Sequence, residues 1–352
     1  MEDTDGQNSQ LLLFRRIKEN LPQHLSLAEE TASILNISTD SAYRRIRGEK
    51  GISFEEARTL CLHFRISADQ LFFKDNGTIL FSGATFAGIH ELTFDLFLKG
   101  VLKELQYFNS FDHKEITHMP KDITFFYFFY FKELAAFKLF FWMKTFLQCS
   151  LYTESLYTME HYTESMQQIW GKIISEYNKL PSREIWNKEN LHTTIRQIEY
   201  YKDARMFTSA QEIITLYDCL EKLINHIERQ AEHGQKFLIT ESQPAADGGR
   251  LSLFLNEYVL GDNSNLAVLN NNLKIAYLNY SLLNSIRTTD IAFVEYFEKC
   301  IVNHIRKSVL VSMVGEKERA VFFYEMRKKI KDRKEAAADY HPGEKRPHPV
   351  GS

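Results

Sequence analysis

The sequence predicts a mainly α-helical protein, with a five-helix N-terminal domain followed by a larger helical region that ends in a small α+β part. Helix-capping signals recur between residues 26 and 70, and from residue 91 to 233 the apolar residues fall at three- and four-residue steps. After residue 250 apolar residues alternate with polar ones, which is the pattern of a β-strand. We therefore expect the chain to end in a three-stranded antiparallel meander packed against helices.

The helices of the N-terminal domain, residues 11–75, begin at polar capping residues. A first helix over 11–20 is ended by Pro22. Ser26, Ser53 and Ser67 are each followed three residues later by Glu or Gln, which is the pattern of a capping box. Ser38 starts a further helix with an acid in its first turn, where the helix dipole favours negative charge.

A tight turn at 35–38 joins the second and third helices, because Asn36 tolerates the left-handed conformation that ends a helix. Two short helices joined in this way form a helix-turn-helix. Ala32 is the small residue at the helix crossing, while Ala42 and Ile46 face inward. This spacing is similar to that of Cro/lambda-repressor-type domains. The run DSAYRRIRGEK, followed by ISFEEARTLC and ISADQLF, resembles the BetR-type branch of bacterial transcriptional regulators over residues 11–75.

The resemblance implies that the third helix enters the DNA major groove. With Ala42 and Ile46 inside, helical geometry turns Asp40, Tyr43, Arg44 and Arg47 outward. By position, Thr39, Asp40, Tyr43 and Arg44 match the base-contacting places of the family, and Arg47 matches a backbone-contacting one. Arg45 and Lys50 are placed to neutralise phosphates. The predicted DNA-binding residues are Thr39, Asp40, Ser41, Tyr43, Arg44, Arg45, Arg47 and Lys50.

Composition sets limits on the whole chain. The 352 residues carry a formal net charge of −3, which argues against a protein that coats nucleic acid and allows a local basic site. Four cysteines lie far apart without metal-ligand spacing, so we expect buried free thiols in a reducing cytoplasm. The polar, acidic segment 1–10 has no signal-peptide character and is predicted to be disordered.

After a linker at 76–90, residues 91–233 are predicted to form a helical domain. Segment 125–147 is apolar nearly all round, which fits either a buried central helix or a membrane span. Its four charged residues favour the buried helix. Segment 116–123 is a strand or a loop. Other helices are expected at 92–108, 152–177, 186–201 and 209–233, and a TPR-like array is not supported by any fixed period.

The α+β part follows a loop at 234–250 and spans 251–331. Strands are expected at 251–260, 267–269 and 274–280, with a hairpin turn through the three Asn residues at 270–272. Helices at 290–305 and 316–331 would cover the apolar face of this meander. Residues 332–352 lack apolar periodicity and are predicted to form a disordered tail.

No catalytic set stands out, so we expect neither an enzyme nor a cofactor or metal. His226, Glu228 and His233 are better explained as a solvated helix face. The polar run at 262–265 lacks the spacing and the closing Glu of a calcium loop. His113, Glu115 and His118 are better placed in a loop than around a metal.

The sequence therefore predicts a cytoplasmic, sequence-specific transcriptional regulator that binds double-stranded DNA as a homodimer, without membrane contact. Its C-terminal region would dimerise, or sense an unidentified small ligand or protein effector. The alternative is a non-enzymatic interaction scaffold that uses the helical hairpin for protein contacts.

Overall fold

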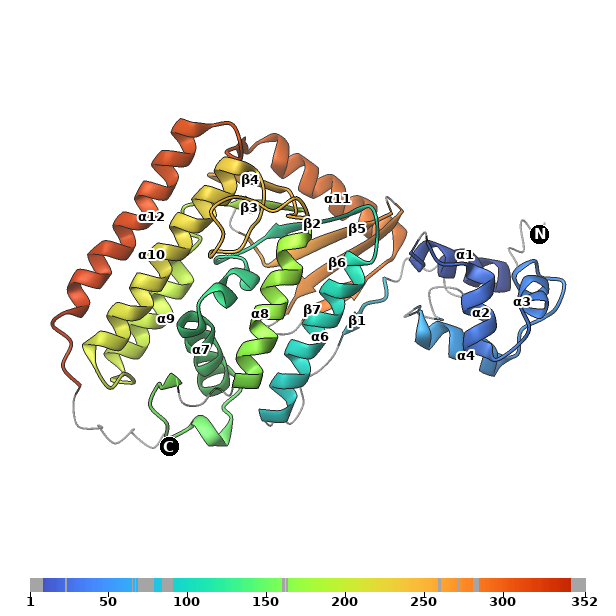
Figure 1. The fold of residues 1–352 in the computed structure, drawn as a ribbon, viewed down its shortest axis with the longest axis horizontal. Helices are drawn as coiled ribbons and strands as arrows, with labels where there is room; N and C mark the ends of the chain where they lie inside the picture. The colour runs from blue at the N-terminus through green and yellow to red at the C-terminus, as the bar shows by residue number, and fades with distance from the viewer. Residues whose placement is uncertain are drawn as a thin grey trace.

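The chain forms a small N-terminal helical domain beside a larger α/β domain (Figure 1). This computed structural model describes residues 9–22, 24–64, 66, 68, 79–83, 91–159, 162, 164–258, 261–270, 272–280 and 285–342. The predicted cap at Ser67, the fifth helix and the turn at 74–77 lie outside these residues. Ser9 and Gln10, expected to be disordered, are the first residues of a helix.

Four helices build the N-terminal domain: α1 (Ser9–Asn20), α2 (Leu27–Leu35), α3 (Thr39–Ile46) and α4 (Phe54–His63). Their shared core is fully apolar. Leu13, Phe14 and Ile17 of α1 pack with Leu60 of α4, and each is at most 2% exposed. This burial holds the short helices together, since helices of this length are marginal on their own.

The prediction of a mainly α fold with a three-stranded meander was wrong, because the larger domain contains an eight-stranded mixed sheet of order β1-β7-β6-β5-β2-β3-β4-β8. β2 pairs in parallel with β3, and β3 with β4, while the remaining pairs are antiparallel. The strands are β1 (Ser82–Gly83), β2 (Lys114–Met119), β3 (Ser182–Trp186), β4 (Leu251–Leu255), β5 (Ser264–Leu269), β6 (Leu273–Asn279), β7 (Ser285–Thr288) and β8 (Val309–Leu310).

The hairpin of β5 and β6 confirms part of the meander, with pairs that run from Asn265 opposite Tyr277 to Leu269 opposite Leu273. However, β4 lies between β3 and β8 and does not touch this hairpin. β2 and β3 come from the region predicted to be a separate helical domain. The two predicted parts, 91–233 and 251–331, therefore share one sheet and one core.

Most helices cover one face of the sheet, and α11 covers the other (Figure 1). The helix expected at 152–177 begins only with α8. The helix expected at 186–201 begins only at His192 as α9, because Trp186 is the last residue of strand β3. The helix expected at 209–233 is confirmed as α10, with Ser209 as its N-cap. α12 extends past the predicted start of the disordered tail at 332. The bounds are α6 (Glu91–Asn109), α8 (Glu164–Lys179), α9 (His192–Asp203), α10 (Ala210–His233), α11 (Ile291–Arg306) and α12 (Glu316–Ala337).

The aromatic segment at 125–147 is buried, as predicted, but is not one helix. It forms a 3-10 turn η1 (Phe125–Tyr130), the helix α7 (Lys132–Phe141) and a π-helical turn η2 (Trp142–Phe146). Crossing a membrane needs a length and an apolar character that no described helix has. The segment instead fills the core between the sheet and the outer helices.

A buried carboxylate lies at the centre of the sheet on β3. Glu184 is fully buried and accepts hydrogen bonds from five side chains. Such a carboxylate is tolerated in a core when donors replace the water that it has lost. Lys236, also fully buried, lies with its Nζ 3.6 Å from the centre of the Tyr177 ring. The five donors to Glu184 are Thr124 Oγ1, Tyr127 Oη, Tyr177 Oη, Ser182 Oγ and Trp186 Nε1.

Candidate nucleic-acid interface

The predicted N-caps at Ser26, Ser38 and Ser53 and the predicted turn at Asn36 are confirmed. Ser26 Oγ accepts from the backbone N–H of Glu29 and Ser38 Oγ from that of Ser41, at 3.5 and 3.3 Å. Asn36 has φ 52° and ψ 50°, so it ends α2 in the left-handed conformation. These short-range contacts fix the angle at which α3 leaves α2.

The capping box is complete only at the start of α4 among the described helices of this domain. Ser53 Oγ accepts from the backbone N–H of Glu56 at 3.1 Å, and Glu56 Oε2 accepts from the backbone N–H of Ser53 at 2.8 Å. At Ser26 only the first of these two bonds forms. The reciprocal pair at Ser53 holds Glu56 in place for a second contact with α3.

One face of α3 is exposed and carries most of the predicted DNA-binding side chains. Ala42 is fully buried and Ile46 half-buried, which confirms the inward face. The hydroxyl-bearing ring of Tyr43 is 48% exposed, and the side chain of Arg44 is 53% exposed. Thr39 and Asp40 at the start of α3, and Arg47 and Lys50 after it, are also exposed, whereas Ser41 is half-buried.

Arg45 does not join this exposed face, although we expected it to contact phosphate. Only 6% of the residue is exposed, and its Nη2 donates to Glu56 Oε1 at 2.8 Å. Its Nη1 donates to the Oγ and the carbonyl oxygen of Ser41, at 2.6 and 3.2 Å. Arg45 therefore ties α3 to α4, and we leave it out of the proposed interface.

Glu49 forms a salt bridge with the guanidinium group of Arg47 on the exposed face. Arg47 Nε and Nη2 donate to its two carboxylate oxygens at 2.6 and 3.1 Å, while Arg44 Nε lies 3.9 Å away. The hydrogen bond with Arg47 lowers the pKa of Glu49 and raises that of Arg47. A phosphate that binds Arg47 must displace this carboxylate first, because a bidentate guanidinium contact is already in use.

Gln10 is a structural residue that the sequence did not reveal. Its Nε2 donates to the carbonyl oxygens of Arg45 and Lys50 at 2.6 and 2.8 Å, and its Oε1 accepts from the backbone N–H of Ile52 at 3.0 Å. These bonds fasten the loop after α3 to α1. No sequence signal marks them, since the partners are about 40 residues apart.

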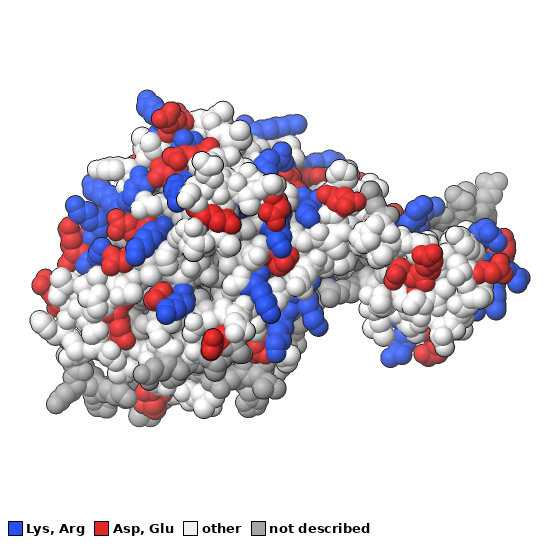
Figure 2. All heavy atoms as spheres, in the orientation of Figure 1, with Lys and Arg blue, Asp and Glu red and all other residues white. Residues whose placement is uncertain are grey.

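The exposed face of α3 lies at the end of the N-terminal domain that points away from the α/β domain (Figure 1). Figure 2 shows basic and acidic side chains side by side at this end of the molecule, without a continuous basic surface. Such a balance limits the nonspecific attraction to DNA. Specific contacts, rather than charge alone, would have to provide affinity.

Comparisons with protein-family models, with curated proteins and with solved structures gave no match to this chain. Neither of the histidine groups considered in the sequence forms a metal site in the part of the chain that the structure describes. His226 is buried instead of solvated, and His118 lies within strand β2 instead of a loop.

Proposed function

We propose that this protein is a sequence-specific DNA-binding transcriptional regulator whose α3 enters the major groove. The observation that supports the proposal most is the exposed face of α3, which carries Tyr43 and Arg44 and follows the capped turn at the end of α2. Arginine can donate two parallel hydrogen bonds to guanine. A tyrosine can pack its ring against a thymine methyl group or donate its hydroxyl hydrogen to a phosphate. The N-terminus of α3 is placed to approach bases.

A homodimer is part of the proposal. One copy presents three exposed basic residues on this face, Arg44, Arg47 and Lys50, and Glu49 neutralises one of them. A single copy would bind weakly, whereas two copies on paired half-sites add their binding free energies. The α/β domain would hold the two copies together or change their affinity for DNA in response to an effector.

The test is a selection of genomic DNA fragments by the full-length protein at near-physiological salt. Wild type should retain a few fragments, and Arg44→Ala should lose roughly 10-fold or more in affinity for them, since a base contact contributes about 1–3 kcal/mol. Arg58→Ala is the matched control, because Arg58 is a similarly exposed arginine on α4. Equal losses in both variants, or equal retention of all fragments, would argue for nonspecific charge and against the proposal.

The interaction scaffold has one observation in its favour. Phe54 and Leu62 on α4 are 81% and 66% exposed, which is unusual for large apolar side chains and fits a protein contact. The same experiment separates the two functions. A scaffold would retain no fragment, and its partner binding would be lost in Phe54→Ser but not in Arg44→Ala.

A further inference from the structure

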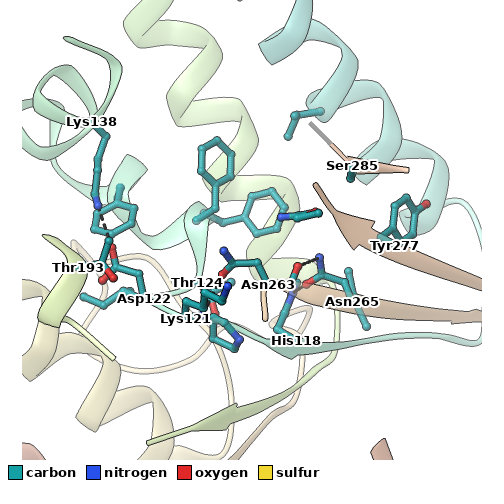
Figure 3. Close-up of a pocket in the computed structure, with 18 of the residues that line it drawn as sticks. His118, Lys121, Asp122, Thr124, Lys138, Thr193, Asn263, Asn265, Tyr277 and Ser285 are labelled. Atoms are coloured by element: carbon teal, nitrogen blue, oxygen red, sulfur yellow. Dashed lines mark hydrogen bonds and ion pairs between the residues drawn. The ribbon is translucent and has the colours of Figure 1, made fainter. Parts of the chain in front are cut away.

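A cavity of about 350 Å³ lies in the α/β domain between α6, the aromatic segment and the sheet (Figure 3). Phe97 and Phe108 from α6, Phe125 and Phe126 from η1, and Trp142 from η2 form much of its wall. A volume of this size with mostly apolar walls that include several aromatic rings is typical of a site for a small molecule. Figure 3 shows Lys138, Asp122 and Thr193 at one end, Tyr277 and Ser285 at the other, and His118, Asn263 and Asn265 between them.

The half-buried and buried charges in the wall of this cavity are already paired. Lys138 Nζ donates to Asp122 Oδ2 at 2.8 Å, and Arg287 Nη1 donates to Glu104 Oε1 at 2.8 Å. Lys121 carries a further charge, but it is exposed. A charged ligand would therefore be buried without a counter-charge, which costs several kcal/mol. The cavity favours an uncharged ligand.

His118 offers a buried hydrogen-bond acceptor at this cavity. Asn265 Nδ2 donates to the carbonyl oxygen of Asn263 at 3.1 Å, so Asn265 Oδ1 faces His118 and accepts from its Nδ1–H at 2.6 Å. This places the lone pair on His118 Nε2, which has no hydrogen-bond partner among the described residues. Burial lowers the pKa of His118, so the ring is neutral and Nε2 can accept a hydrogen bond.

Two further atoms of the wall lack partners in the described part of the chain. Asp122 Oδ1 is an acceptor, while its Oδ2 accepts from Lys138 and Thr194. The indole Nε1–H of Trp142 is a donor. These buried atoms have almost no accessible surface in this structure. A ligand that moves the wall enough to reach them would provide the hydrogen bonds that they lack. A hydroxyl group suits this set, because it both donates and accepts.

We propose that this cavity binds an uncharged aromatic molecule that carries a hydroxyl group, with His118 Nε2 as the acceptor for the hydroxyl. The aromatic wall takes the rings, and the unpartnered polar atoms select for the hydroxyl. A ligand at this site would be the effector that the α/β domain senses, so the regulatory role of the site rests on the proposed function. Its test uses no DNA, so the site and the proposed DNA binding can fail separately.

The test compares three probes that share one ring system, by isothermal titration calorimetry on the full chain at pH 7. 2-Naphthol has a hydroxyl donor, 2-methoxynaphthalene has the same shape without the donor, and 2-naphthoate is an anion. We expect 2-naphthol to bind at one site per chain, roughly 10-fold more tightly than 2-methoxynaphthalene, because one hydrogen bond is lost. The anion should bind most weakly.

Three variants locate the site. His118→Phe should bring the affinity ratio of 2-naphthol to 2-methoxynaphthalene close to one, whereas His226→Phe, the same change at a buried histidine outside this cavity, should keep it. Val101→Trp should fill the cavity from α6 and abolish binding of both.

Equal affinity of the wild type for both neutral probes, tightest binding of 2-naphthoate, or no binding at all would overturn the proposal. A ratio unchanged in a folded His118→Phe variant would do the same. If that variant does not fold, the comparison of probes on the wild type still decides the question.

Discussion

Replacing Lys236 with Met should change how the stability of the α/β domain depends on pH. The Lys236 side chain is fully buried, and its Nζ has no hydrogen-bond partner among the described residues. Burial lowers its pKa to about 7, although the nearby carboxylate of Glu184 acts in the opposite direction. In the unfolded chain this group returns to its ordinary pKa of 10.5.

The sign of the effect follows from where the proton is bound. Between pH 7 and 10.5 the unfolded chain holds a proton that the folded protein has released, so the free energy of unfolding rises with pH. One pH unit in this window changes it by up to about 1.4 kcal/mol, and the step from pH 7 to 9 by about 2–3 kcal/mol. Below pH 7 both states hold the proton, and the contribution no longer changes.

Urea unfolding followed by circular dichroism at pH 7, 8 and 9 measures this difference. Lys236→Met should be more stable than wild type at pH 7, and its advantage should shrink by about 2–3 kcal/mol at pH 9. Other titrating groups cancel in the comparison, since both proteins contain them. Parallel stability curves would refute the reasoning, because they would show that Lys236 keeps its proton in the folded state.

Lys138→Met is the matched control for a buried lysine that has partners. Its Nζ donates to Asp122 Oδ2 and Gln197 Oε1, both at 2.8 Å. Removing it leaves the Asp122 carboxylate without a counter-charge, so this variant should lose about 3 kcal/mol or more at pH 7. A gain in stability here would contradict the distinction between the two lysines.

Three more outcomes are expected from the structure. Glu49→Gln should free Arg47 and strengthen binding to nonspecific DNA several-fold at low salt, with a salt dependence steeper by about one charge, measured by fluorescence anisotropy. Arg45→Ala should cost the N-terminal domain about 2 kcal/mol or more in urea unfolding, whereas Arg44→Ala should change its stability by less than about 0.5 kcal/mol. Tyr177→Phe should cost about 1–3 kcal/mol in thermal unfolding, because a buried carboxylate loses a donor.

Each of these outcomes has a control in the chain. Glu55→Gln removes an exposed acid from α4 and should leave the salt dependence closer to wild type than Glu49→Gln does. Tyr200→Phe alters a tyrosine that is 58% exposed and should be nearly neutral in thermal unfolding. Equal stability losses in Arg45→Ala and Arg44→Ala would contradict the inward position of Arg45.

Sequence reasoning succeeded where the deciding contact lies within a few residues. The caps at Ser26, Ser38 and Ser53 and the left-handed Asn36 each depend on a bond to a backbone group close by in the chain. The β5–β6 hairpin belongs to the same class, since a short turn joins its strands. The outward face of α3 follows from helical geometry alone, except at one residue.

That exception is Arg45, whose position depends on a contact with another helix. Its position on α3 indicates a solvent-facing cation, but Glu56 on α4 draws it inward. The pairing depends on how α3 and α4 pack, which no spacing within α3 encodes. For the same reason the sequence did not reveal Gln10 as part of the candidate site. The pairing of Arg47 with Glu49 is local, but no helical spacing marks it because both residues follow α3.

The sequence by itself determined where helices begin, which segment is buried and how the last hairpin turns. Only the tertiary structure decided that β3 is a strand and that β4 joins it in parallel. β3 is covered on both faces, so its apolar residues do not alternate as they do in a strand with one exposed face. Its acid, Glu184, is acceptable in the core only because donors from distant segments meet there. Parallel pairing is set by contacts between residues far apart in the chain, and these exist only once the helices have packed on the sheet.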